Sequence, residues 1–271
     1  MLTQKEKGER FRALHAGPAF VIPNPWDVGS ARILEGLGFQ ALATSSAAAA
    51  NAIGRKDHGL SREEMLAHAR SVVRATDLPV SADLGNGFGD SPEVVAETIS
   101  LAAEAGLVGC TIEDASADER HLYDFELAVE RVAAATEAAR ALPFPFMLTA
   151  RAHNFLFPNP SLPETIRRLQ AYEKAGADIL FAPRLPDLET VRTVCGSISK
   201  PFNFMVGIKG KSFPVADLEA AGVRRISLAT SLYRAAMTGL LDATREILTD
   251  GRFSFVDRSV VSSELIKLMR I

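Results

Sequence analysis

One pattern recurs along the chain and limits the folds it can adopt: the end of a helix, a glycine, and then an apolar run. It occurs in LEGLGFQAL (34–42), AEAGLVGCTI (103–112), EKAGADILFA (173–182) and EAAGVRRISLA (219–229). A glycine after the last helical turn supplies a left-handed cap, and the run that follows it is typical of a buried parallel strand. Helix–glycine–strand units repeated over a whole chain indicate an α/β fold with a parallel sheet.

The spacing of these units favours a closed barrel. Gly38, Gly106 and Gly176 lie about 70 residues apart, which is two βα units of roughly 35 residues each. Helical periodicity, as in 62–75, 92–106 and 125–142, separates the apolar runs, and Ser91–Pro92 is a good start for the second of these helices. We therefore predict a (β/α)8 TIM-type barrel, with strands at 20–23, 41–45, 80–84, 108–113, 146–151, 179–183, 202–206 and 225–229.

The chain continues after the eighth strand for more than one helix. No linker or low-complexity segment interrupts it, so we predict a single domain over 1–271 with a helical tail at about 231–271. The last apolar helix, SSELIKLMRI, needs a partner surface for Ile266, Leu268, Met269 and Ile271. That surface is either the same barrel or a neighbouring subunit, and the residues alone favour neither.

Composition and charge exclude several classes of function. The 30 basic and 33 acidic residues give a formal net charge of −3, and no basic stripe suggests nucleic-acid binding. No stretch approaches the roughly 18 apolar residues of a membrane span, and the first residues do not form a secretory signal. Cys110 and Cys195 have no metal-binding or disulfide spacing, so we expect two reduced, buried thiols in a cytoplasmic protein.

Polar residues gather where the predicted strands end. In a barrel of this kind the chemistry lies at those carboxyl ends, so an arginine, several carboxylates and several hydroxyls are expected to share one rim. An apolar packing surface would not need them. The residues are Asn24, Trp26 and Asp27; Thr44, Ser45 and Ser46; Asp83 and Asn86; Glu113 and Asp114; Arg151, His153 and Asn154; and Asn203.

These residue types predict a site for a small anionic substrate and a hard cation. Asp83 and Glu113 offer oxygen ligands of the type Mg²⁺ prefers, and Arg151 can grip a carboxylate or phosphonate with two parallel hydrogen bonds. The backbone amides of SSAAAANAIG suit a second oxyanion. Plainer explanations stay open: Asp83 as a turn cap, Glu113 as a metal-free partner of Arg151, Asn203 as a strand-end amide, and His153 as a supporting or surface histidine.

The stretch VSADLGNGFGDSPE (80–93) has three glycines on alternate positions after Asp83. Its GNGFG differs from the G-x-G-x-x-G dinucleotide fingerprint, and no acidic residue ends a strand about 20 residues later. It also lacks the Lys-Ser/Thr ending of a P-loop. What remains is a flexible turn beside a carboxylate.

Taken together, these motifs resemble the isocitrate lyase/phosphoenolpyruvate mutase superfamily over nearly the whole chain, and a phosphonomutase-type member in particular. PNPWDVGSARILEGLGFQAL is similar to its opening unit, and LPVSADLGNGFGD to its metal loop. TIEDA and TARAHNF resemble its glutamate and arginine strands. TSSAAAANAIGRKDHG resembles its second-strand loop, and KPFNFMVGIKGKSFPVADLEAAGVRRISLATSLYRAA its last two units.

The resemblance implies a set of roles. The family makes or breaks a C–C or C–P bond beside a 2-oxo acid, through an enolate held on Mg²⁺ or Mn²⁺. Asp83 would bind the metal directly and Asp57 and Glu113 through water, while Ser46 and neighbouring amides would bind a carboxylate and Arg151 the anionic end. The implied catalytic residues are Arg151, Ser46, Asp57 and Glu113; the implied substrate-binding residues are Trp26, Ser45, Ser46, Ala47, Asn86, Arg151 and Asn203. A homodimer or homotetramer that exchanges its last helix between subunits is also implied.

Several departures from the family pattern narrow the activity. Gly85 stands where a second acid is usual, which should weaken Mg²⁺ binding or leave more water around the ion. Phe88 replaces a tyrosine, and Ala152 and His153 replace Thr-Asp. The segment DASADERHLYDF lacks the lid cysteine of isocitrate and methylisocitrate lyases, so those activities are not expected.

The first expectation is therefore a phosphonomutase-type enzyme acting on a 2-oxo acid or its phosphonate. In that case His121 and Asp118 of the lid are candidates to hold the phosphoryl group. The alternatives are a C–C lyase or oxaloacetate decarboxylase, and a barrel that binds a dicarboxylate with little turnover.

Overall fold

Eight parallel strands form the centre of the molecule. The computed structural model describes residues 2–118 and 120–271. The strands run in the order β1-β8-β7-β6-β5-β4-β3-β2, and a hydrogen bond from Ala43 N to Pro23 O (3.1 Å) joins the two ends of the sheet. They are β1 (Phe20–Ile22), β2 (Leu42–Ala43), β3 (Val80–Asp83), β4 (Gly109–Glu113), β5 (Met147–Arg151), β6 (Ile179–Phe181), β7 (Phe202–Met205) and β8 (Val223–Ser227). The predicted TIM-type barrel is confirmed, with each strand within a few residues of its expected position.

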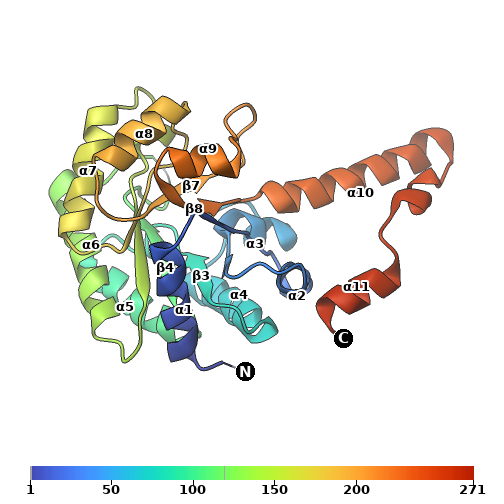
Figure 1. Ribbon diagram of the computed structural model, residues 1–271, viewed down its shortest axis with the longest axis horizontal. Helices are drawn as coiled ribbons and strands as arrows, with labels where there is room; N and C mark the ends of the chain where they lie inside the picture. Colours follow the sequence, from blue (N-terminus) through green and yellow to red (C-terminus); the bar gives the residue numbers. More distant parts are fainter. Residues whose placement is uncertain (1, 119) are drawn as a thin grey trace.

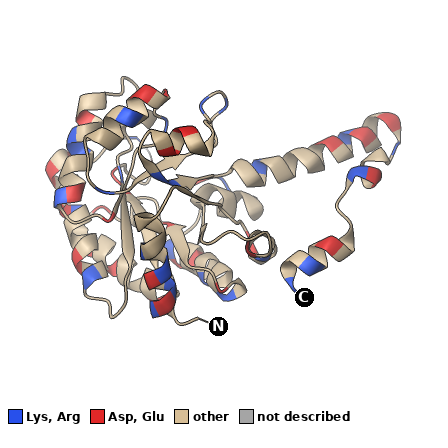
Figure 2. Cartoon of the chain, viewed as in Figure 1, with Lys and Arg blue, Asp and Glu red and all other residues tan. Residues whose placement is uncertain are grey.

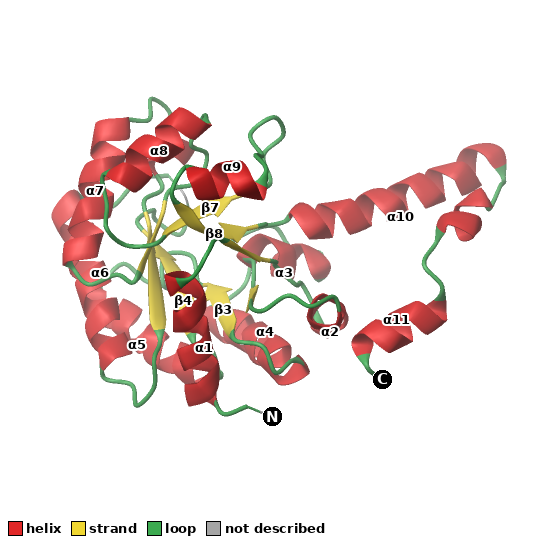
Figure 3. Ribbon diagram, viewed as in Figure 1, coloured by secondary structure: helices red, strands yellow, loops and turns green. Residues whose placement is uncertain are grey.

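Helices surround this sheet and separate its strands (Figures 1 and 3). Helix α4 spans the predicted residues, and α5 begins at Pro92 with the Ser91 side chain accepting a hydrogen bond from Val94 N, as expected. The helices between the start of the chain and β8 are α1 (Gln4–Ala16), α2 (Val28–Gly36), α3 (Ser46–Ala52), α4 (Arg62–Ala75), α5 (Pro92–Glu104), α6 (Phe125–Arg140), η1 (Asn154–Leu156), α7 (Leu162–Lys174), α8 (Leu188–Gly196) and α9 (Val215–Ala220). Figure 2 shows charges of both signs interspersed on the outer helices.

The glycines of the recurring unit take the left-handed conformation that their pattern predicts. Gly106 follows α5 with φ = 93°, and Gly176 follows α7 with φ = 99°. A Cβ atom at these positions would lie 2.8 Å from Val73 and 2.6 Å from Thr136. A glycine is therefore required at each of these positions for two reasons: its positive φ angle and the close approach of the neighbouring helix.

The amino-terminal helix α1 closes one end of the barrel. Phe11 is fully buried and packs among side chains from the barrel interior, including Ile22, Val108 and Met147. Because Phe11 fills the end where the strands begin, the opposite end, where they finish, is the open one. The site residues predicted at the strand ends therefore lie around the open end of the barrel.

The tail after β8 leaves the barrel and then returns (Figure 1). Helix α10 (Ser231–Asp250) has no buried residue, η2 (Ser254–Arg258) follows, and α11 (Ser262–Met269) packs on α2 of the same chain. The contact is close, because a Cβ on Gly36 would lie 2.2 Å from the carbonyl oxygen of Leu268. Over the described parts of the chain, no helix has both the length and the apolarity to cross a membrane.

Candidate active site

Two adjoining cavities open at the carboxyl ends of the strands, and Asp83 lines both. The larger, of about 230 Å³, lies beside the loop after β3 and is also lined by Ser46, His58 and Asn86. The smaller of the two rim cavities, about 50 Å³, lies in the barrel mouth, and its polar lining is Asn24, Thr44, Ser45, Asp83, Thr111, Arg151, Asn203, Arg225 and Ser227. A separate cavity, of about 730 Å³, lies away from the rim beside α1 and is mostly apolar.

Asp83 ends β3 with its two carboxylate oxygens in different roles. Oδ1 accepts a hydrogen bond from Gly85 N (3.3 Å), which is the turn-capping role left open by the sequence. Oδ2 accepts hydrogen bonds from the Ser46 hydroxyl (2.9 Å) and from Ser46 N (3.4 Å). Asp83 therefore joins the β3 loop to the start of α3, and one oxygen faces the amide and hydroxyl predicted to bind a carboxylate.

Glu113 is 4% exposed and lies beside two basic side chains. Its Oε2 lies 3.2 Å from Arg151 Nη1 and 3.3 Å from His153 Nδ1. Burial by itself raises the pKa of this carboxyl, but Arg151 and His153 outweigh burial and lower the pKa to about 2. Oε1 is also buried and has no hydrogen-bond partner among the described residues. The pair with Arg151 thus leaves one carboxylate oxygen without a hydrogen-bond donor among the described residues.

His58 occupies the space beside Gly85, where the family pattern would place an acid. Its Nδ1 lies 3.9 Å from the Cβ position of residue 85, and its Nε2 lies 3.9 Å from Asp57 Oδ2. His58 has φ = 56° and Gly85 has φ = 54°, so both turns are left-handed. Burial raises the pKa of Asp57, with a further rise from Asp83, while His58 and Ser46 oppose it. Sequence reasoning missed His58; its only signal was its place directly after Asp57.

The loop after β3 is held in place rather than flexible, which corrects the sequence-based expectation. Arg131 of α6 is 1% exposed and donates hydrogen bonds to the carbonyls of Gly89 (2.6 Å), Asp90 and Asn86. The Tyr123 ring stacks on this guanidinium at 4.2 Å. Three glycines give the loop its path, but a buried cation at its centre fixes it.

The remaining predicted binding residues fall into two groups. Asn86 donates a hydrogen bond to the Tyr123 hydroxyl (2.9 Å), and Asn203 donates one to the Ser227 hydroxyl (3.1 Å), while both line a rim cavity. Trp26 and Ala47 line neither cavity. The Trp26 ring packs edge-on against Tyr233 at the start of α10 (5.6 Å), and Ala47 lies in the first turn of α3.

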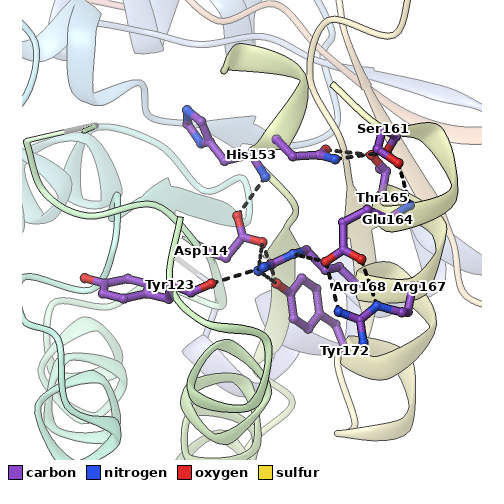
Figure 4. A network of polar contacts seen from close by, with 10 residues as sticks. Asp114, Tyr123, His153, Ser161, Glu164, Thr165, Arg167, Arg168 and Tyr172 are labelled. Atoms are coloured by element: carbon purple, nitrogen blue, oxygen red, sulfur yellow. Dashed lines mark hydrogen bonds and ion pairs between the residues drawn. The ribbon is translucent and has the colours of Figure 1, made fainter. Parts of the chain in front are cut away.

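Asp114, which follows Glu113 in sequence, belongs to a buried structural network (Figure 4). It accepts hydrogen bonds from His153 N (2.7 Å), Arg168 (3.1 Å) and the Tyr172 hydroxyl (2.5 Å). Asn154 is tied to the same helix, since its Oδ1 accepts from Thr165 (2.6 Å). These two rim residues position His153 beside Glu113 and do not themselves face a cavity.

Neither thiol can act as an acid at the rim. Cys110 lies fully buried in β4, and burial raises its pKa strongly; Cys195 lies in α8, where burial raises its pKa to about 12.

The described part of the segment after β4 is held by contacts among its own residues. The Ser116 hydroxyl donates a hydrogen bond to Asp118 (2.7 Å), and Arg120 lies 3.2 Å from Asp118. Ala117 of this segment lines the larger cavity.

The carboxylates of the rim are of a kind that suits a hard divalent cation with a mostly aqueous shell. Asp83 lines both cavities, and Oε1 of Glu113, which lines neither, is buried without a hydrogen-bond partner among the described residues. No three His, Cys, Asp or Glu side chains in residues 2–118 and 120–271 are arranged to hold an ion by themselves. A cation here would therefore keep several waters, as Mg²⁺ does in proteins.

Comparisons with known proteins give this arrangement a family. The model described as phosphoenolpyruvate phosphomutase matches residues 11–248. The chain belongs to this family. Within the same superfamily, a Corynebacterium glutamicum protein named "Probable 2-methylisocitrate lyase 2" is 30% identical over 98% of this chain and 89% of its own length.

Two further relatives cover most of the chain. Oxaloacetate decarboxylase 1 of Pseudomonas putida is 29% identical, over 87% of this chain and 82% of its own. The crystal structure of a Burkholderia cenocepacia protein described only as a lyase/mutase is 47% identical with a TM-score of 0.96, and the match covers 99% of this chain and 97% of that one. The resemblance predicted from the motifs is thus confirmed, and this family member is an enzyme of the phosphoenolpyruvate mutase/isocitrate lyase superfamily.

Proposed function

We propose that this enzyme is a divalent-metal-dependent C–C lyase that decarboxylates a small 2-oxo dicarboxylate through an enolate. The observation that carries this proposal is the rim itself: Asp83 bound to Ser46, beside the buried Glu113–Arg151 pair, with no thiol able to donate a proton. The relationship to an oxaloacetate decarboxylase supports it.

Decarboxylation suits a rim without a cysteine acid. In this reaction the bond between C3 and the C4 carboxylate breaks, CO₂ leaves, and the electron pair moves toward the 2-oxo oxygen to give an enolate, which then takes a proton from water. No protein acid has to protonate a leaving group. Cleavage of a hydroxylated tricarboxylate, by contrast, needs both a base for the hydroxyl and an acid for the departing carbon.

The rim residues would divide the work as the family resemblance implies. Asp83 would bind the cation, with Asp57 and Glu113 holding its waters, and the cation when bound would act as a Lewis acid for the 2-oxo oxygen. Arg151 would hold a carboxylate by two hydrogen bonds, since Glu113 fixes its guanidinium. Ser46 and the amides around Ala47 would bind the other oxygens, and Ser45, Asn86, Asn203 and Trp26 would shape the surrounding pocket.

A phosphonomutase is the second candidate, supported by the name of the matching family model. Transfer of a phosphoryl group needs cations around its oxygens, and in that case Arg151 would supply one. The predicted alternative groups are less well placed, because Asp118 is engaged by Ser116 and Arg120. The two candidates thus differ in the substrate's distal group, a carboxylate or a phosphonate.

We also propose that the protein works as a homodimer or homotetramer. Helix α10 has no buried residue, and large apolar side chains stay exposed along the tail, among them Leu240, Leu248 and Phe253. Exposed apolar area of this extent is typical of a surface that another subunit covers.

The first experiment is calorimetric titration of oxalate, a mimic of the pyruvate enolate, with and without Mg²⁺. We expect micromolar affinity only when both Mg²⁺ and Asp83 are present, so Mg²⁺ removal or Asp83→Ala should weaken binding to the millimolar range, whereas the exposed Asp77→Ala at the far end of β3 should not. Release of CO₂ from oxaloacetate would then identify the decarboxylase, and turnover of phosphonopyruvate instead would identify the mutase. Binding without either turnover would mean a dicarboxylate-binding barrel, and no binding at all would overturn the site.

A further inference from the structure

A buried arginine lies inside the barrel with little to balance it. Arg225 extends from the inner face of β8 across the barrel, where its Nη1 donates to the Thr149 hydroxyl of β5 (3.1 Å). The residue is 3% exposed, and its guanidinium lies 6.0 Å from the Phe11 ring that closes the other end. Its Nε has no hydrogen-bond partner among the described residues.

Among the described residues, no carboxylate lies within ion-pair distance of Arg225. Its charge is balanced only in part, by Asp83 from farther away. Burial lowers its pKa to about 10, so it stays charged at neutral pH. Burying a charge without an ion-pair partner is unfavourable, and an anion bound beside Arg225 would offset that cost.

The small cavity of the barrel mouth offers the place for that anion. Arg225 and Arg151 both line it. Its volume of about 50 Å³ is enough for a few waters or one carboxylate group. Two guanidinium groups, one at the rim and one a layer below, thus meet in a space the size of a single small anion.

We propose that Arg225 is a second anion-binding residue of this site, and that a carboxylate of the substrate enters the barrel mouth between Arg225 and Arg151. This inference rests on the proposed function for the identity of the substrate, but the binding of a carboxylate to Arg225 can be tested without any metal. It assigns the carboxylate that Arg151 holds a position below the rim, anchored from both sides.

The test measures thermal unfolding in EDTA with and without oxalate, for the wild type, Arg225→Met and Arg224→Met. Arg224 is the matched control, because it directly precedes Arg225 in β8 and its side chain donates a hydrogen bond to the Val223 carbonyl. We expect saturating oxalate to raise the Tm of the wild type and of Arg224→Met by about 5 °C. Arg225→Met should lose that rise while its unliganded Tm stays equal to or above that of the wild type.

The opposite pattern would overturn the inference. If Arg225→Met unfolds at a lower temperature yet responds to oxalate as the wild type does, Arg225 is a packing residue; a wild type that does not respond also refutes the site. Should the methionine variant fail to fold, Arg225→Gln replaces it, with an expected loss of at least tenfold in oxalate affinity. Inorganic phosphate as a second probe separates a carboxylate site from a general anion site: a Tm rise equal to that from oxalate would refute the carboxylate assignment. Failure of the proposed function shows separately, as an absence of Mg²⁺-dependent binding through Asp83.

Discussion

Arg131 and Arg225 are both almost completely buried, yet one has its charge distributed over several partners and the other does not. Arg131 donates to three backbone carbonyls and stacks on Tyr123, and it fixes the loop after β3. Among the described residues, Arg225 has one hydrogen bond, to Thr149, and its Nε has no hydrogen-bond partner. The comparison indicates that the first arginine is part of the scaffold, while the second still needs a ligand.

Another buried arginine resembles Arg131 in having several partners. Arg168 is paired with both Asp114 and Glu164 and also donates to the Tyr123 carbonyl (Figure 4). Arg151 is intermediate, because Glu113 balances its charge while its guanidinium still faces the barrel mouth. The number of partners therefore separates arginines that hold loops from arginines that line the cavity of the barrel mouth.

The largest expected effect follows from removing the best-paired arginine. Arg131→Met removes the donor from three backbone carbonyls, one of them buried, so we expect the free energy of unfolding to fall by about 3–5 kcal/mol, measured by urea denaturation. Arg225→Met in the same assay should change it by less than about 1 kcal/mol or raise it. The exposed Arg167→Met serves as the control, with an expected change within about 0.5 kcal/mol. Equal losses in Arg131→Met and Arg225→Met would remove the distinction between them.

A second variant would convert Arg151 into an unpaired cation. The pKa of Glu113 lies at about 2 in the folded protein, below its usual 4.5, so its contribution to stability is present above pH 4.5 and disappears as the pH falls toward 2. We expect Glu113→Gln to lower the free energy of unfolding by about 3 kcal/mol at pH 7, with the difference closing in acid. Metal-free denaturation from pH 7 to 2.5 measures this. Glu97→Gln, which breaks an exposed pair with Arg62, should show no comparable pH dependence.

The sequence predicted most of the fold because its signals were local. The glycine after each helix and the apolar run that follows it place the strands, and strand ends place Asp83, Glu113 and Arg151 on one rim. What it could not predict depends on contacts between distant segments. Arg131 lies on α6, about forty residues after the loop it fixes, and the position of His58 depends on a left-handed turn. Arg224 and Arg225 are adjacent, and only the closed barrel shows which of them points inward.

The smallest expected effect concerns the opposite end of the barrel, where His15 packs between Phe11 and Phe20. Burial, and then the charge of Arg225, lower the pKa of His15 to about 3. Below pH 6.5 the unfolded chain takes up a proton that the folded chain refuses, so stability falls as the pH drops from 6.5 toward 3. We expect His15→Gln to lose about 2 kcal/mol less than the wild type between pH 7 and 5, and the exposed His121→Gln to behave as the wild type.

The same titration also tests the charge of Arg225. Because that charge helps to hold His15 neutral, its removal in Arg225→Met should raise the pKa of His15 and shrink the loss of stability in acid. An Arg225→Met protein with the full acid loss of the wild type would mean that the guanidinium is already neutralised in the free protein. Arg225 would then not differ from Arg131 in the balance of its charge, whatever rise in Tm oxalate produces.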